Sequence, residues 1–89
     1  MNEIKVSEFY NIEIFMEYNN YNFKFPVINA KYENFNAIFD INNNEIIKNY
    51  FPPTGEEFVK DWINENKDEL IKMNNQKDYH KVKKIILRK

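Results

Sequence analysis

The side chains that most enzymes use for catalysis are scarce in this 89-residue chain. A serine–histidine–acid triad would need its single serine and single histidine, Ser7 and His80, and no pattern in the sequence brings them together. One glycine, Gly55, cannot build a phosphate-binding loop, which needs several. One histidine without any cysteine falls short of a typical catalytic zinc site. We therefore expect a protein that is not an enzyme and that holds no cofactor.

Carboxylates are plentiful, but no spacing singles out two of them as an acid–base pair for hydrolysis. Residues 40–44 place oxygen ligands at the first, third and fifth positions, as at the start of a calcium-binding EF-hand loop. The sixth position should be glycine and is Glu45, and the twelfth should be glutamate and is Phe51. This run is better interpreted as a hairpin turn, and no metal site is predicted.

An aromatic loop is the strongest candidate for a binding surface. Its aromatic residues alternate with asparagines, a combination that offers rigid anchors beside adaptable hydrogen-bonding groups. The candidate partner-binding residues are Tyr18, Tyr21, Phe23 and Phe25. Two alternatives stay open: these rings alternate into the core as a strand, or they stack on unpaired bases, although Lys24 is the one positive charge nearby.

Positive charge is concentrated at the C-terminal end. Residues 1–76 hold 13 acidic and 7 basic side chains, whereas residues 77–89 hold 1 acidic and 6 basic ones. Such a strip can contact phosphates. The candidate nucleic-acid contacts are Lys81, Lys83, Lys84 and Arg88. The alternative is a solvated terminal strand whose lysines protect its edge. His80 lies among these lysines, and their charge is expected to disfavour its protonated form.

Hydrophobic spacing predicts the elements that must position these residues. Period-two alternation predicts strands at 12–18, 27–32, 35–41 and 45–50. Asparagine-rich stretches supply the turns between them, because asparagine tolerates left-handed backbone conformations. Thr54 precedes Glu57 by three residues, the spacing of a capping box, and apolar residues then recur at helical intervals. We predict a helix over 54–75 and a last strand or ordered tail over 80–88.

Together these elements predict a single α+β domain spanning residues 1–89. An antiparallel meander of about four to five strands, mostly within 1–51, would carry one long amphipathic helix on one face, with Trp62 as its anchor. No window is apolar enough to span a membrane, and the first residues lack the pattern of a signal peptide. A cytoplasmic protein without membrane contact is expected.

Residues 8–19 and 30–41 resemble the strands of a widespread prokaryotic family of small proteins of unknown function, and residues 58–70 resemble its tryptophan-containing helix. Genes of that family often lie beside another small gene, in pairs that resemble toxin–antitoxin modules. Its members typically carry a histidine-rich segment, Asn-Asp-His-x-Pro-Pro-His-Phe-His, between the first two strands. Here residues 19–29 contain no histidine, and Pro26 is the one clear counterpart.

The resemblance and the missing histidines favour a scaffold used for binding. Our leading hypothesis is a non-catalytic protein-binding module of the toxin–antitoxin or phage-inhibitor type, the latter including anti-defence, anti-CRISPR-like proteins. It would block the surface of a toxin, an antitoxin or a host nuclease, and a homodimer is compatible with it. The alternative is a small RNA-binding or RNA-cleaving toxin that uses the C-terminal basic strip with His80.

Overall fold

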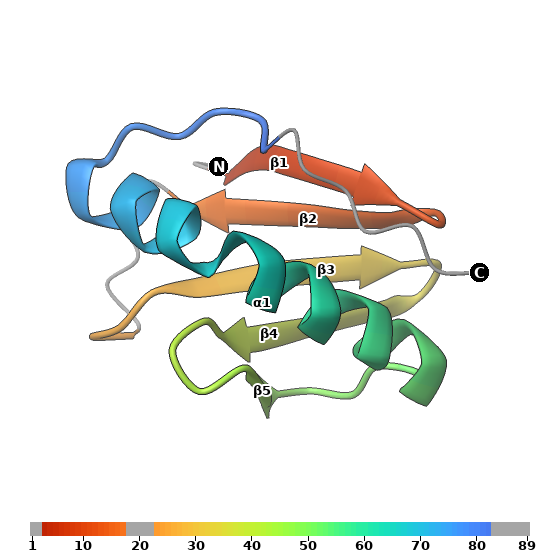
Figure 1. Cartoon of the computed structure of the whole chain (residues 1–89). Coiled ribbons are helices and arrows are strands. Elements are labelled where there is room, and N and C mark those ends of the chain that lie inside the picture. Colours follow the sequence, from red (N-terminus) through yellow and green to blue (C-terminus); the bar gives the residue numbers. More distant parts are fainter. Residues whose placement is uncertain (1–2, 18–22, 83–89) are drawn as a thin grey trace.

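The computed structural model describes residues 3–17 and 23–82. They form an antiparallel sheet in the order β1-β2-β3-β4-β5, with one helix lying across one of its faces (Figure 1). The elements are β1 (Glu3–Phe9), β2 (Ile12–Glu17), β3 (Val27–Tyr32), β4 (Phe35–Asp40), β5 (Glu45–Lys48) and α1 (Pro53–Gln76). The predicted α+β class and helix-on-sheet architecture are confirmed, but β1 was not among the predicted strands.

The core lies between the sheet and α1. Trp62 is fully buried, and its ring centroid is 5.9 Å from that of Phe9 on β1, as expected of the helix anchor. Alternate residues of each strand face the helix, because successive side chains of a strand point to opposite faces. The buried apolar residues are Val6, Phe9, Ile12, Ile14, Met16, Ile28, Ala30, Ala37, Phe39, Ile41, Phe51, Val59, Trp62, Ile63, Leu70, Met73 and Val82.

A β-bulge interrupts the pairing of β1 with β2. Lys5 lies opposite Phe15 and Ser7 lies opposite Ile14, so Val6 is an extra residue in β1. Val6 and Ser7 are consecutive and both buried. The bulge therefore shifts the hydrophobic alternation of β1 by one residue at this point.

Tight turns join the strands. Tyr10 and Asn11 form the two-residue loop between β1 and β2, with φ values of 52° and 64°. The predicted turn after β4 is confirmed, and Asp40 organises it: one carboxylate oxygen accepts the Asn42 backbone N–H at 2.9 Å, and the other accepts the Asn43 side-chain amide at 2.9 Å. The Asn44 side chain donates to the Lys60 carbonyl of α1 at 3.0 Å, which fixes this turn to the helix.

Helix α1 begins and ends differently from the prediction. Pro52 is the N-cap without a side-chain capping bond, and Pro53 is the first helical residue. The predicted capping box at Thr54 is therefore wrong, since a proline with its fixed φ starts the helix one residue earlier. At the other end Lys77 adopts φ 54° and closes the helix with its N–H on the Met73 carbonyl. Because α1 ends after Gln76, Lys72 lies before the last turn, and that turn contains no basic residue.

Residues 77–82, which follow α1, do not form a strand. The Val82 N–H donates to the Val6 carbonyl at 2.7 Å, and the Val82 side chain is buried. Residues 80–82 are thus an ordered extension of the domain. The rest of the predicted 80–88 element lies outside the described residues.

Candidate functional site

The predicted aromatic loop is described in part. Phe23 is half-buried and Phe25 is exposed, and their ring centroids are 5.7 Å apart. Both precede β3, at the end of the sheet opposite to the start of α1 (Figure 1). Tyr18 and Tyr21 lie outside the described residues. The two phenylalanines thus form a partly exposed ring pair.

A second aromatic surface lies at the other end of the sheet. The turn between β1 and β2, the turn between β3 and β4, the link from β5 to α1 and the first turns of α1 all meet there (Figure 1). Between them is a groove of about 170 Å³ with a mostly apolar lining. This aromatic groove is lined by Tyr10, Ile12, Tyr32, Pro52, Thr54, Gly55 and Phe58.

The walls of the aromatic groove are held by ring contacts. Tyr10 and Phe58 have centroids 4.5 Å apart, and Tyr32 lies 6.5 Å from the buried Phe51. At Gly55 a side chain would not fit, because a Cβ there would lie 2.8 Å from Cε2 of Phe51. Because Gly55, in the first turn of the helix, has no side chain, the Phe51 ring can pack against the helix backbone at this position.

Exposed aromatic side chains lie on the segments that meet at this end of the sheet. Tyr50 is 61% exposed, the most of any large apolar residue in the described ranges, and its ring is 5.8 Å from that of Phe35. Tyr10 is 43% exposed at its turn. Its left-handed backbone conformation costs a non-glycine residue about 1–2 kcal/mol. An aromatic residue therefore stands at a turn position that glycine or asparagine would occupy with less strain.

Three glutamates are adjacent in sequence to residues that line the aromatic groove. Glu33 is exposed in the turn after β3, and Glu57 is exposed beside Phe58. Glu56 is paired with Lys60 at 3.0 Å. This end of the molecule thus combines apolar anchors with negative charge, in keeping with the acidic excess of residues 1–76.

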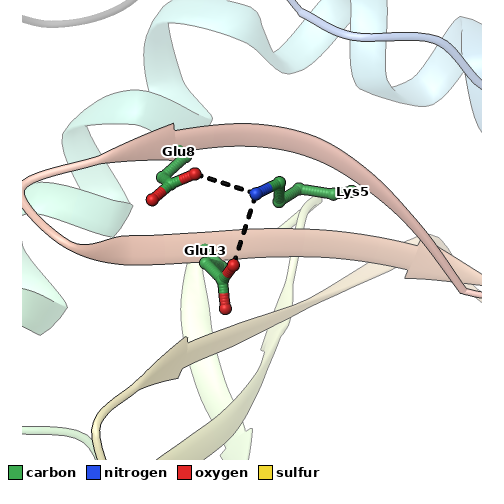
Figure 2. A network of polar contacts seen from close by, with 3 residues as sticks. All are labelled: Lys5, Glu8 and Glu13. Carbon is green, nitrogen blue, oxygen red and sulfur yellow. Dashed lines mark hydrogen bonds and ion pairs between the residues drawn. The ribbon is translucent and has the colours of Figure 1, made fainter.

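The sheet face away from α1 is polar and internally paired. Nζ of Lys5 lies 2.8 Å from Glu8 and 3.3 Å from Glu13 (Figure 2). The hydrogen bond to Glu8, with a smaller effect from Glu13, raises the pKa of Lys5, and the same bond lowers the pKa of Glu8. A general acid needs a carboxyl group with a raised pKa, whereas the pKa of Glu8 is lowered.

A third pair of charges on this face involves β3. Nζ of Lys31 lies 3.0 Å from Glu3 and 4.4 Å from the centre of the Phe15 ring. The Asn29 side chain also donates to Glu3, at 3.1 Å. These contacts pair the charges of Lys31 and Glu3, whereas the buried Oδ1 of Asn29 accepts no hydrogen bond within the described residues.

The predicted electrostatics of His80 are wrong. Its Nε2 lies 2.9 Å from the Glu69 carboxylate on α1, and this hydrogen bond raises the pKa of His80 with further help from Asp78. Glu69 is eleven residues away in the chain. The nearby carboxylates outweigh the neighbouring lysines that the sequence placed around the ring.

Of the candidate nucleic-acid contacts, Lys81 lies within the described residues and is exposed, whereas Lys83, Lys84 and Arg88 lie outside them. The hollow beside His80, of about 420 Å³, is lined by more acids than bases. Its lining is Asp68, Glu69, Lys72, Met73, Gln76, Asp78 and His80. Acidic lining around His80 counts against a phosphate contact at this point.

Neither a metal-binding cluster nor a membrane-spanning helix is found among the described residues. Within residues 3–17 and 23–82, no three His, Asp or Glu side chains are grouped so that they could hold a metal ion. The described part of the chain also has no helix long and apolar enough to cross a membrane.

Fold and site together define an α+β domain with an aromatic groove at one end of its sheet. Residues 11–75 match the protein family described as "Domain of unknown function (DUF4160)", and the chain belongs to this family. Neither the curated proteins nor the solved structures include a match to it. The match covers β2 through most of α1 and therefore includes nearly all of the groove.

Proposed function

We propose that this protein is a non-catalytic protein-binding module that acts by covering a partner's surface. The observation that carries the proposal is the aromatic groove, with the exposed rings of Tyr10 and Tyr50 beside it. Large, rigid aromatic anchors around a small pocket are typical of the residues that dominate protein interfaces.

The size and borders of the groove indicate the chemistry of the partner. A volume of about 170 Å³ is below the range of most small-molecule sites and suits a single large side chain. The exposed Glu33 and Glu57, adjacent in sequence to the lining residues Tyr32 and Phe58, favour basic neighbours. The partner is therefore a protein that presents one bulky apolar side chain flanked by lysine or arginine.

The biological setting follows from the family resemblance. It favours a toxin–antitoxin pair or a phage inhibitor of a host nuclease, where small proteins work by blocking a partner. Nuclease surfaces are often basic because they bind a polyanion, which agrees with the glutamates adjacent in sequence to the groove lining. Phe23 and Phe25, at the far end of the sheet, are a second candidate contact.

The test is a pull-down with tagged full-length protein from nuclease-treated lysate of its native host, read by mass spectrometry. The wild type is compared with Tyr10→Ser and Tyr50→Ser at the groove and with Phe25→Ser at the second candidate contact. We expect a stoichiometric protein partner that Phe25→Ser retains and that the other two variants lose.

Two results would contradict this assignment. Retention of the partner by Tyr10→Ser and Tyr50→Ser, with loss by Phe25→Ser, would move the site to the predicted loop. Recovery of RNA from untreated lysate, abolished by Lys81→Glu, would support the alternative of a small RNA-binding or RNA-cleaving toxin instead.

A further inference from the structure

The outer edge of β1 is covered by the segment that follows the helix. β1 is the first strand in the sheet order, so no other strand of the described ranges pairs with its outer side. Residues 78–82, here called the strap, approach this edge, and the Val82 N–H donates to the Val6 carbonyl at 2.7 Å. Exposed edges invite pairing with other chains, and proteins commonly cover them in this way.

Three anchors hold the strap. At its start the Asp78 N–H donates to the Met73 carbonyl at the end of α1, at 3.2 Å. At its end the Val82 side chain is 3% exposed and belongs to the core. Between them the His80 ring contacts Glu69 of α1 at 2.9 Å. The first two anchors are a backbone bond and apolar burial, and neither titrates near neutral pH.

His80 is the one anchor that changes charge near neutral pH, and it is the chain's single histidine. The charged groups around it are Glu69, Asp68 and Lys72 from α1 and Asp78 from the strap itself. Carboxylates outnumber the single lysine, so the site favours imidazolium. The adjacent Lys81 acts on Glu8 of β1, where it helps to lower the pKa of that carboxyl.

We propose that the strap is a pH-sensitive cover of the β1 edge, held closed by protonated His80 and opened more often when His80 is neutral. The pKa of His80 is raised in the closed state by its hydrogen bond with Glu69. The contribution of this pair is therefore fully present below the ordinary histidine value and is lost as the pH rises through the raised value.

The size of the effect follows from exposure. The two side chains are 51% and 43% exposed, so solvent screens their attraction. Burial of Val82 holds the strap closed for most of the time at either pH. We expect the opening equilibrium to change by about two- to fivefold across the titration.

Hydrogen exchange of the full-length protein, measured by NMR, tests the proposal. The readout is the protection factor of the Val82 amide, with the Ile41 amide, bonded to the Pro26 carbonyl, as internal reference. Between about pH 5.5 and about pH 8, Val82 protection should fall by about two- to fivefold relative to Ile41. His80→Gln and Glu69→Gln should each remove this dependence, and the control Lys81→Gln should keep it.

Equal behaviour of the Val82 and Ile41 amides across this pH range would overturn the proposal. So would a His80→Gln protein that keeps the wild-type dependence. The readout does not involve partner binding, so its outcome is independent of the proposed function.

Discussion

The rings of Tyr10 and Phe58 lie 4.5 Å apart, with their planes tilted by 32°. This contact joins the turn between β1 and β2 to the second turn of α1, two elements that are far apart in the sequence. Because both rings are fixed by their neighbours, little side-chain entropy would be lost when a partner binds there.

Tyr50→Ala should weaken binding to the partner more than it weakens the fold. The ring is 61% exposed and packs on Phe35 alone among the ring contacts of the described residues. We expect a loss of about 2 kcal/mol in binding free energy, measured by calorimetry, and less than about 1 kcal/mol in the free energy of unfolding. Ile47→Ala, at another exposed apolar residue, is the matched control. Unchanged binding by Tyr50→Ala would remove this residue from the interface.

Gly55→Ala should destabilise the protein, although alanine is the better helix former. In an exposed helix the exchange stabilises by about 1 kcal/mol. Here the added Cβ would lie 2.8 Å from the Phe51 ring, which is buried and cannot move away without disturbing the core. We expect a net loss of about 1–3 kcal/mol in urea denaturation. The double variant with Phe51→Leu should recover part of it, and a more stable Gly55→Ala protein would contradict the packing described.

Asp40→Ala should loosen the turn after β4. Its buried carboxylate accepts hydrogen bonds from the backbone and side chain of Asn43 and from the backbone of Asn42. Loss of these bonds should cost about 1.5–3 kcal/mol in the free energy of unfolding. The exposed Asp68, replaced by alanine, serves as control and should change stability by less than about 0.5 kcal/mol. Equal effects of the two variants would count against this role.

Trp62→Phe should cost far less than Trp62→Ala. The side chain is fully buried, and its indole N–H finds no acceptor in the described part of the chain. Phenylalanine loses volume but also removes a buried, unbonded donor, so the two effects oppose each other. We expect a loss of about 1 kcal/mol in the free energy of unfolding for Trp62→Phe and of about 3–5 kcal/mol for Trp62→Ala. Unfolding is monitored by circular dichroism, because both variants remove the single tryptophan that would give a fluorescence signal.

Lys5→Met should change the titration of Glu8. The hydrogen bond from Lys5 lowers the pKa of Glu8 from its ordinary value of 4.5, so removal of the lysine should raise it again. Since the folded pKa is lowered, the contribution of Glu8 is present above 4.5 and is lost as the pH falls through the folded value.

The pKa shift of Lys5 has the opposite sign to that of Glu8. The pKa of Lys5 is raised, so its contribution is present below 10.5 and is lost as the pH rises through the folded value. Carboxyl carbon shifts followed by NMR would report Glu8, with Lys48→Met as control. An unaltered Glu8 titration in Lys5→Met would exclude the pairing shown in Figure 2.

Most of the architecture could be predicted from local patterns. β2, β3 and β4 follow alternation, and the helix follows the spacing of residues such as Trp62 and Leu70, which face the core. β1 escaped because its pattern is broken: Ile4 and Val6 face the helix in one phase, and Ser7 and Phe9 in the other. A bulge of this kind hides a strand from any rule based on strict alternation.

The groove was harder to predict because its residues come from separate elements. Tyr10 and Tyr50 look like ordinary strand-end residues in the sequence. One clue was the aromatic pair Tyr50-Phe51 just before Pro52 and Pro53. The charge state of His80 also depended on a residue that the fold supplies, Glu69. Sequence neighbours could not reveal it, since a helix surface faces residues far along the chain.

The bulge in β1 also bears on how this chain can change in length. Lys5 opposes Phe15 and Ser7 opposes Ile14, so a chain without Val6 would keep both pairs in a regular ladder. Every remaining side chain of the strand would stay on its present face, and the cost would be the loss of one buried valine and of the carbonyl that accepts the Val82 N–H. At this position the strand can therefore lose one residue without reversing which face its remaining side chains occupy.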